Sequence, residues 1–312
     1  MGEPGARLTE YGSEDFGSLR TVMLHAPVRS LGLVNERTRT TYLFDWVPDV
    51  ERYLEEHHAY RTLLESTGVR VHELADHIDK TRGLADQRPN LAYLHDIAVV
   101  TRRGAVLSRM SSFARASEET VVKEALGDLG IPVYHEFGPG HDFESFLALS
   151  PRTALIADTE RHLARSIENV IPVMLQVFQE VLVVEVPEER RFMHADMVFG
   201  LVAPDLALCF LPAIRRAVQI DQGGREQVDF EDAMAARGVE LIGVSDEEQK
   251  RWACSWVPLS PGRIIAYDIS FGRRTQEALA RRGTEIMEFH PEDLLAGGGS
   301  LRCLTLALHR SG

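Results

Sequence analysis

The stretch EETVVKEALGDLGIPVYHEF, residues 118–137, contains the pattern that decides the fold. Residues 118–129 have apolar side chains at helical spacing, and Gly130 stands where such a helix should end. The β-branched and aromatic run at residues 131–137 then predicts a short strand. The same order of helix and strand recurs at residues 60–74, 161–186, 227–244 and 274–289. A glycine stands between helix and strand in each of these units except residues 161–186.

Apolar stretches split by a turn lie between these units and predict β-hairpins. The first apolar stretch of the chain, residues 21–26, and the last, residues 303–309, have no such partner nearby. We expect these two to pair, which would complete a fifth hairpin and close a ring. The other four hairpins are expected at residues 97–110, 146–157, 197–210 and 256–269.

Five hairpins and five helix–strand units predict an α/β fold, a fivefold pseudo-symmetric propeller built from repeated hairpin–helix–strand units. We expect one domain over residues 1–312, with the polar residues 1–17 as a flexible N-terminal segment. The alternative is an ordinary α/β fold, in which helix, glycine and strand recur because such chains are commonly built that way.

Composition narrows the class of partner. The formal net charge is −13, from 34 Lys and Arg against 47 Asp and Glu. A field of that sign repels phosphate backbones and anionic lipids, which argues against nucleic acid and membrane surfaces. The polar N-terminus lacks a signal sequence, and no apolar run reaches the roughly 20 residues of a membrane span. Three cysteines without a CxxC pair indicate a reducing compartment, so we expect a cytoplasmic protein.

Residues with reactive side chains recur at one place in the unit, directly before a hairpin or at the start of the last predicted strand. In a pseudo-symmetric ring, equivalent positions of successive units face the same central opening, so these side chains should converge. The set combines a thiol, an imidazole and several carboxylates: Asp96, Asp142, Glu144, His194, Asp196 and Cys303.

These residue types suit covalent chemistry on a guanidinium. A cysteine thiolate is a nucleophile, and His194 could act first as a general acid and then as a base. Asp196 could orient that imidazole or contact substrate. Unpaired carboxylates such as Asp96 and Asp142 favour a planar cation that donates paired N–H groups. A lone cysteine in an apolar strand is more often a core residue, which is the expectation for Cys209 and Cys254. No helical His-x-x-x-His motif is present, so no metal is expected.

Four segments in order resemble the guanidino-modifying enzymes, the pentein superfamily of arginine deiminases, dimethylarginine dimethylaminohydrolases and amidinotransferases. The opening SLRTVMLHAPVRSL is similar to the start of arginine deiminases, and PNLAYLHD resembles their PNLxFTRD segment. HADMVF resembles their His-x-Asp motif, and GGGSLRC resembles the glycine-rich approach to the nucleophile. The resemblance runs from about residue 18 to residue 310 and omits the helical insertion of many arginine deiminases.

The resemblance implies a role for each matching residue. Cys303 would form a covalent amidino intermediate, and His194 would protonate the leaving nitrogen and then activate the incoming water or amine. Asp96 would grip the guanidinium together with the acid before the second hairpin. It also implies no cofactor and a small-molecule guanidino substrate, and it leaves open a homo-oligomer. Arg115 and Arg161 would bind the substrate carboxylate, and Asn90 would line the pocket.

The chain departs from the family before the second hairpin, where deiminases typically have Glu-Gly-Gly-Asp and this chain has Asp142-Phe143-Glu144-Ser145. Counting back from Ser150 places Asp142 at the catalytic acid, as in amidinotransferases, whereas a local shift would make Glu144 that acid. The deiminase-like opening, with Arg115 and Arg161 for a substrate carboxylate, leads us to expect hydrolysis of arginine or an arginine-like compound to a ureido product and ammonia. The alternatives are transfer of the amidino group from arginine to an amine, and a propeller that binds a ligand without catalysis.

Overall fold

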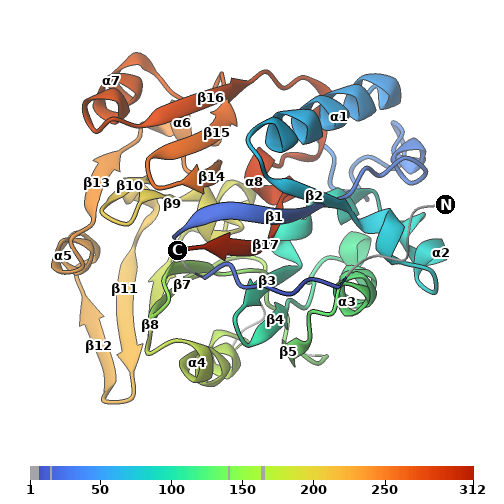
Figure 1. Cartoon of the computed structure of the whole chain (residues 1–312). Helices are drawn as coiled ribbons and strands as arrows, with labels where there is room; N and C mark the ends of the chain where they lie inside the picture. Colours follow the sequence, from blue (N-terminus) through green and yellow to red (C-terminus); the bar gives the residue numbers. More distant parts are fainter. Residues whose placement is uncertain (1–6, 15, 140, 163–165) are drawn as a thin grey trace. The chain divides into compact units, whose positions relative to one another are not determined.

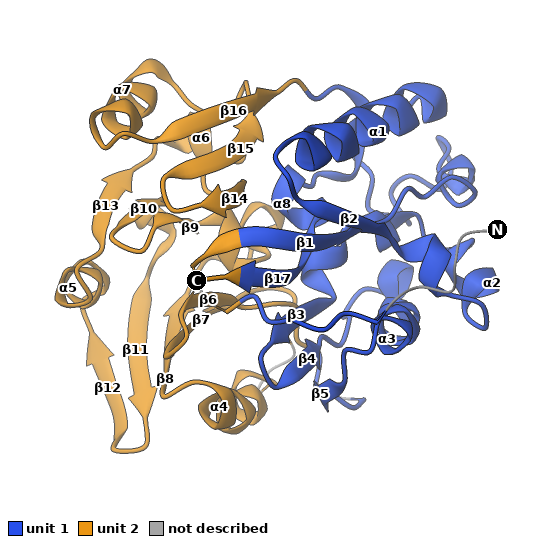
Figure 2. Ribbon diagram, in the orientation of Figure 1, with its two compact units in different colours: residues 1–13, 19–142, 291–310 blue, residues 14–18, 143–290, 311–312 orange. Residues whose placement is uncertain are grey.

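The computed structural model describes the chain except for residues 1–6, 15, 140 and 163–165. The described residues form two compact units (Figure 2). Unit 1 comprises residues 1–13, 19–142 and 291–310, and unit 2 comprises residues 14–18, 143–290 and 311–312. No helix among the described residues is both long enough and apolar enough to cross a membrane.

Unit 1 contains two three-stranded sheets within its described residues, ordered β17-β1-β2 and β3-β4-β5 (Figure 1). The α-helices are α1 (Val50–Ser66), α2 (Arg82–Ala85), α3 (Glu118–Asp128) and α8 (Leu301–Leu304). The strands are β1 (Ser18–Leu24), β2 (Arg70–Glu73), β3 (Ala98–Thr101), β4 (Gly104–Leu107), β5 (Val133–Glu136) and β17 (Leu306–Ser311).

Unit 2 contains three sheets within its described residues, ordered β12-β11-β8-β7-β6, β13-β10-β9 and β14-β15-β16. The helices are α4 (Ser166–Val177), α5 (Phe230–Ala236), α6 (Asp246–Gln249) and α7 (Arg273–Arg281). The first sheet comprises β6 (Leu147–Ser150), β7 (Thr153–Asp158), β8 (Glu180–Glu185), β11 (Arg216–Asp221) and β12 (Gly224–Val228). The other sheets comprise β9 (Phe199–Ala203), β10 (Leu206–Cys209), β13 (Glu240–Gly243), β14 (Val257–Ser260), β15 (Arg263–Tyr267) and β16 (Glu285–Phe289).

The sheets repeat the predicted unit. Four of them hold an antiparallel hairpin whose second strand pairs in parallel with the strand after a helix. In the fifth sheet β1 lies between β17 and β2, which confirms the predicted pairing of the first and last apolar stretches. The glycines that follow the predicted helices have positive φ angles, a backbone conformation that is strained for residues with a Cβ atom. They are Gly68 at 87°, Gly130 at 81°, Gly238 at 73° and Gly283 at 70°.

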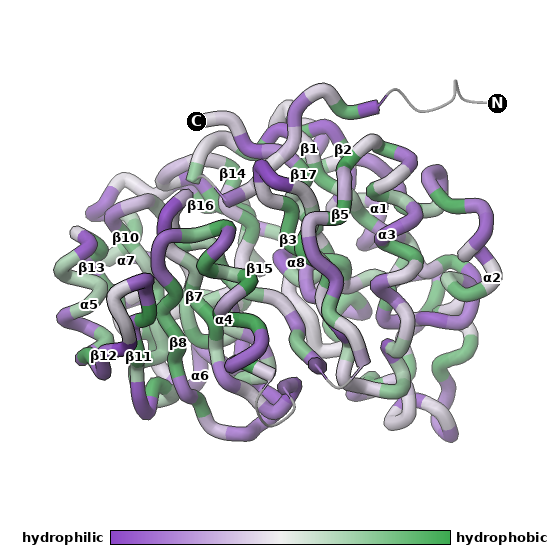
Figure 3. The backbone as a smooth tube through the Cα atoms, turned by 90° about the horizontal axis from the view of Figure 1, so that it is seen from below, coloured by the Kyte–Doolittle hydropathy of each residue, from purple (hydrophilic) through white to green (hydrophobic). Residues whose placement is uncertain are grey.

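Apolar side chains from these strands form the cores. In unit 1 they come from β1, β3, β4, α3 and β17, and in unit 2 from β7 to β10 and from β15. Figure 3 shows strands such as β7 and β8 as hydrophobic segments of the chain. The strands are buried because their residues are β-branched or aliphatic on both faces, as in β8 with the sequence EVLVVE.

The structure differs from the sequence analysis around α5 and β12. Residues 227–229 are not helical, because β12 ends at Val228 and Asp229 caps α5 with its side chain. The β11–β12 hairpin itself was not predicted. Within residues 1–17, expected to be a flexible segment, Leu8 and Ser13 donate backbone hydrogen bonds to Leu129 and Val100. Residues 1–6 and 15 of that segment lie outside the described part of the chain.

Candidate functional site

Cys303 lies in a helical turn and not in the strand expected from the sequence. It is the third residue of α8, and β17 begins only at Leu306. Ser300 caps the turn: its Oγ atom accepts hydrogen bonds from the backbone N–H groups of Arg302 and Cys303. The same Oγ lies 3.4 Å from the Cys303 Sγ atom. A hydroxyl therefore contacts the thiol, which is itself 2% exposed.

The glycines before Cys303 are required by close packing. The ring of Tyr93 lies so near that a Cβ atom at Gly297 would overlap its hydroxyl group, and a Cβ atom at Gly299 would overlap its ring carbons. Gly298 between them has a φ of 78°. Tyr93 belongs to the PNLAYLHD segment, so two of the motifs singled out in the sequence pack directly against each other.

Asp96 is held near this turn. It ends the 3-10 helix η4 (Leu94–Asp96), which packs against α8. Its Oδ2 atom lies 2.5 Å from Nη1 of Arg115, and both side chains are buried. Arg115 also contacts Glu118 through Nε at 2.8 Å and donates to the backbone carbonyl of Tyr93. A buried carboxylate needs such a partner, because desolvation without one is costly.

These contacts give Arg115 and Asn90 structural partners within unit 1. The sequence pattern supplied no basic partner for Asp96, yet the structure pairs it with Arg115. The side chain of Asn90 donates to the backbone carbonyl of Tyr42 at 2.6 Å, and the backbone carbonyl of Asn90 accepts from Arg115. Asp142, also in unit 1, is half-buried and has no side-chain hydrogen bond or ion pair to the described residues.

Unit 2 contributes a buried carboxylate–imidazole pair. Nε2 of His194 lies 2.9 Å from Oε2 of Glu144, and the two side chains are 2% and 0% exposed. Nη1 of Arg161 lies 3.7 Å from the same Glu144 oxygen, and Nη2 of Arg161 contacts the Met193 sulfur. Two groups that can carry positive charge, His194 and Arg161, therefore contact the same Glu144 oxygen.

An apolar wall borders this pair. The ring of His162 stacks on Phe143, with centroids 5.1 Å apart. Burial lowers the pKa of His162 to about 4, chiefly because the surroundings disfavour its charged form. Phe143, which replaces a glycine of the family motif, thus supports the segment beside Glu144.

Sequence reasoning missed Ser255, whose Oγ donates to Oδ2 of Asp196 at 2.7 Å. Both side chains are buried, at 3% and 2% exposure. Ser255 stands directly before the hairpin of β14 and β15, the position where the reactive residues of other units were recognised. The positional rule would have found it, but a serine was not among the residue types considered.

Comparison with known families assigns the chain. The family whose sequence profile matches is described as arginine deiminase, and the match covers residues 77–310. The chain belongs to the arginine deiminase family. All nine candidate residues, from Asn90 to Cys303, lie inside the matched range.

Relatives in this family are distant. The arginine deiminase of Listeria welshimeri is 27% identical over 258 residues, which cover 72% of this chain and 63% of that enzyme. This chain therefore spans less than two thirds of the length of that deiminase.

Solved structures confirm the pentein fold. The N-terminal domain of ArgZ, a cyanobacterial arginine dihydrolase bound to product, superposes with a TM-score of 0.70 at 19% identity. That match covers 93% of this chain and 97% of the domain. Dimethylarginine dimethylaminohydrolase from Pseudomonas aeruginosa, complexed with citrulline, gives a TM-score of 0.68 at 17% identity, covering 93% and 99%.

The other two cysteines of this family member are core residues, as expected. Cys209 and Cys254 are buried within the apolar cluster of unit 2. Burial raises the pKa of both thiols well above the usual range, because a thiolate there would be poorly solvated. Among the residues that the structure describes, no group of three or more His, Cys, Asp or Glu side chains could hold a metal ion.

Proposed function

We propose that this protein hydrolyses the guanidino group of arginine, or of an arginine-like amino acid, through a covalent intermediate on Cys303. The observation that carries the proposal is the buried pair of Glu144 and His194 in a member of the arginine deiminase family. An imidazole held by a carboxylate can donate a proton to a leaving nitrogen and later accept one from water. A buried carboxylate also favours a cationic substrate.

In the proposed reaction the Cys303 thiolate attacks the guanidinium carbon and forms a carbon–sulfur bond. The carbon–nitrogen bond to the leaving group breaks, and His194 supplies the proton with which ammonia departs. His194 then takes a proton from water, whose oxygen attacks the same carbon and displaces the thiolate. One guanidinium and one water thus give one ureido group and one ammonium ion.

The carboxylates have separate proposed roles. Glu144 orients the imidazole of His194 and stabilises its protonated form. It takes the place of the family's catalytic acid, two residues after Asp142. Asp96 grips the guanidinium, and its contact with Arg115 fixes the direction of its carboxylate. Asp196, held by Ser255, contacts substrate or orients the imidazole. Arg161 is proposed to bind the carboxylate of an amino-acid substrate.

Likeness to solved structures supports covalent chemistry. The ArgZ domain has been captured with a covalently bound reaction intermediate, with a TM-score of 0.70 and 19% identity to this chain. ArgZ is an arginine dihydrolase and the Listeria protein an arginine deiminase, so two hydrolytic outcomes have precedent among the relatives.

The test is to incubate the purified chain with L-arginine and quantify citrulline, ornithine and ammonia. Deiminase chemistry predicts citrulline and ammonia in equal amounts. Ornithine with two ammonia molecules would indicate dihydrolysis, and ornithine formed only with an added amine would indicate amidino transfer, the reaction suggested by Asp142. Cys303→Ala should abolish turnover, whereas Cys209→Ala should keep it. If neither arginine nor methylated arginines give any product, the proposal is wrong.

A further inference from the structure

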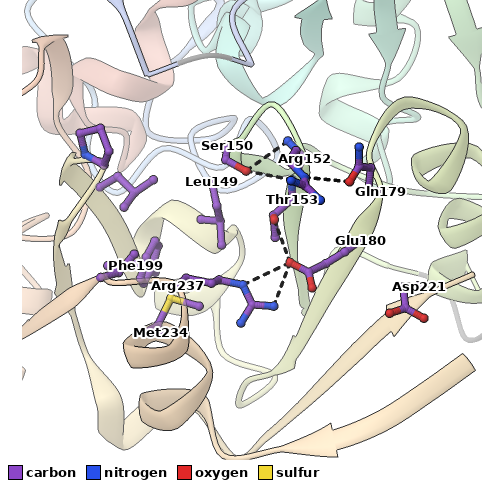
Figure 4. Close-up of a pocket in the computed structure, with 13 residues that line it drawn as sticks. Leu149, Ser150, Arg152, Thr153, Gln179, Glu180, Phe199, Asp221, Met234 and Arg237 are labelled. Atoms are coloured by element: carbon purple, nitrogen blue, oxygen red, sulfur yellow. Dashed lines mark hydrogen bonds and ion pairs between the residues drawn. The ribbon is translucent and has the colours of Figure 1, made fainter. Parts of the chain in front are cut away.

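Unit 2 has a cavity whose lining includes none of the residues of the proposed reaction. Its volume is about 570 Å³, within the range of about 300–1,000 Å³ typical of small-molecule sites. Ser150 and Thr153, at the turn between β6 and β7, form part of its wall (Figure 4). Glu144 precedes the other end of β6, and Arg161 follows the other end of β7. The cavity therefore opens at the opposite end of these strands from the candidate catalytic residues of unit 2.

The floor of the cavity is apolar. Phe199 and Met234 are 1% and 0% exposed, so they belong to the core of the unit and support the floor without offering a ligand any surface. The remaining apolar lining comes from the strands and turns around them: Leu149, Leu201, Pro204 and Val239. Such a floor accommodates an aliphatic or aromatic group of a ligand.

One wall is polar, and its side chains already form hydrogen bonds and an ion pair with one another and with Gln219. Arg237 contacts Glu180 through Nη2 at 2.9 Å and also donates to the side chain of Gln219 at 3.0 Å. Thr153 donates to the same Glu180 oxygen at 2.8 Å. Figure 4 shows Arg237 and Thr153 converging on Glu180. Because their charges are paired, these residues shape the cavity without demanding a counter-ion.

The rim carries a guanidinium with unused donors. Arg152 donates through Nε to the Gln179 side chain at 2.7 Å, which fixes the plane of its guanidinium. Within the described residues, its two terminal amino groups have no hydrogen-bond or ion-pair partner. A guanidinium held in this way presents a pair of N–H groups suited to one carboxylate.

An unused acceptor stands elsewhere on the rim. Oδ1 of Asp221 accepts the backbone N–H groups of Gly223 and Gly224, at 2.7 and 3.2 Å. Its other oxygen has no partner among the residues that the structure describes. The lining thus contains two guanidinium groups and two carboxylates, and its formal charge is zero. Neither an anion nor a cation alone is favoured, whereas a ligand with both charges is.

We propose that this cavity binds a free α-amino acid with an apolar side chain. Arg152 would take the carboxylate, Asp221 would take the ammonium group, and the side chain would lie on the apolar lining at Leu149 and Val239. The site is separate from the proposed catalytic residues of unit 2, and the proposal does not rest on the proposed function.

The test is calorimetric titration of the full chain with L-leucine, isocaproate and isopentylamine, which share one side chain and differ in their charged groups. Leucine should bind in the millimolar range or tighter, and more tightly than either singly charged analogue. No binding of leucine, or equal binding of isocaproate, would overturn the proposal. Activity with arginine is measured separately, so failure of one proposal leaves the other testable.

Variants tie the binding to this cavity. Arg152→Gln should weaken leucine binding about tenfold to a hundredfold, the usual effect of losing a charge-assisted hydrogen bond. Asp221→Asn keeps the turn acceptor and should weaken leucine but not isocaproate. Arg273→Gln, which changes an arginine whose side chain is 91% exposed, is the matched control and should bind normally. Unchanged leucine affinity in Arg152→Gln would show that the amino acid binds elsewhere.

Discussion

Nε2 of His194 and Oε2 of Glu144 lie 2.9 Å apart in the interior of unit 2. This contact favours one of the two acids that the sequence left open before the second hairpin. Glu144 is buried against the imidazole, whereas Asp142 is half-buried and has no side-chain hydrogen bond or ion pair to the described residues. The family's Glu-Gly-Gly-Asp motif is therefore replaced by a segment whose third residue supplies the carboxylate for His194.

Glu144→Gln should lower kcat with arginine by about a hundredfold or more, because the imidazole loses the charge that orients it and stabilises its protonated form. Asp142→Asn should cost less than about tenfold, since its side chain has no partner in the described part of unit 1. Steady-state kinetics of the two variants show whether Glu144 or Asp142 is the acid that acts with His194. A larger loss in Asp142→Asn would assign the acid to the earlier position.

Ser255→Ala should reduce kcat/KM about tenfold by leaving a buried oxygen of Asp196 without its donor. Ser255→Thr keeps the hydroxyl and should recover most of the activity. Thermal unfolding is measured alongside, because a merely structural role would lower stability and leave kinetics of the folded enzyme unchanged. Normal kinetics in Ser255→Ala would remove this residue from the site.

Gly297→Ala and Gly299→Ala should each destabilise the chain by about 1–3 kcal/mol, the usual cost of overpacking. The clash partners differ: the Tyr93 hydroxyl at Gly297 and the Tyr93 ring carbons at Gly299. Tyr93→Phe should therefore partly rescue Gly297→Ala and leave Gly299→Ala unrescued. Urea unfolding of the double variants measures this, and equal rescue at both positions would contradict the described packing.

Stability should fall below neutral pH because of His57. Burial lowers its pKa to about 4, from an ordinary value near 6.5, and its side chain is 2% exposed. The unfolded chain binds this proton first, so the contribution is intact above pH 6.5 and is lost as the pH falls toward 4. The full loss of unfolding free energy is about 3 kcal/mol. His57→Leu should flatten this part of the pH dependence of the unfolding free energy; an unchanged slope would show that His57 does not cause it.

Much of the fold could be predicted because local signals and tertiary structure agree. Gly130 ends a helix in the sequence pattern and adopts a positive φ in the structure. The β11–β12 hairpin was missed because its strands, RAVQID and GREQV, are largely polar and exposed. These strands extend the edge of a sheet, so they need few apolar residues and leave little periodicity.

Side-chain partners in the site were harder to predict than its residues. Asp96 and Arg115 are 19 positions apart, and nothing in either motif predicts their contact. The helical turn at Cys303 was missed because LRCLTLAL continues as an apolar run into β17. Capping by Ser300 decides that turn, and a single hydroxyl is a weak signal beside so many aliphatic residues.

The most direct test of the account is to trap the protein with an amidine electrophile and locate the adduct by mass spectrometry. We predict one adduct, on Cys303, that disappears in Cys303→Ala and in the presence of excess arginine. Cys209 and Cys254 should stay unmodified, because burial raises their pKa and keeps them as thiols. Labelling of Cys209 or Cys254 with none on Cys303 would contradict the assignment of the nucleophile.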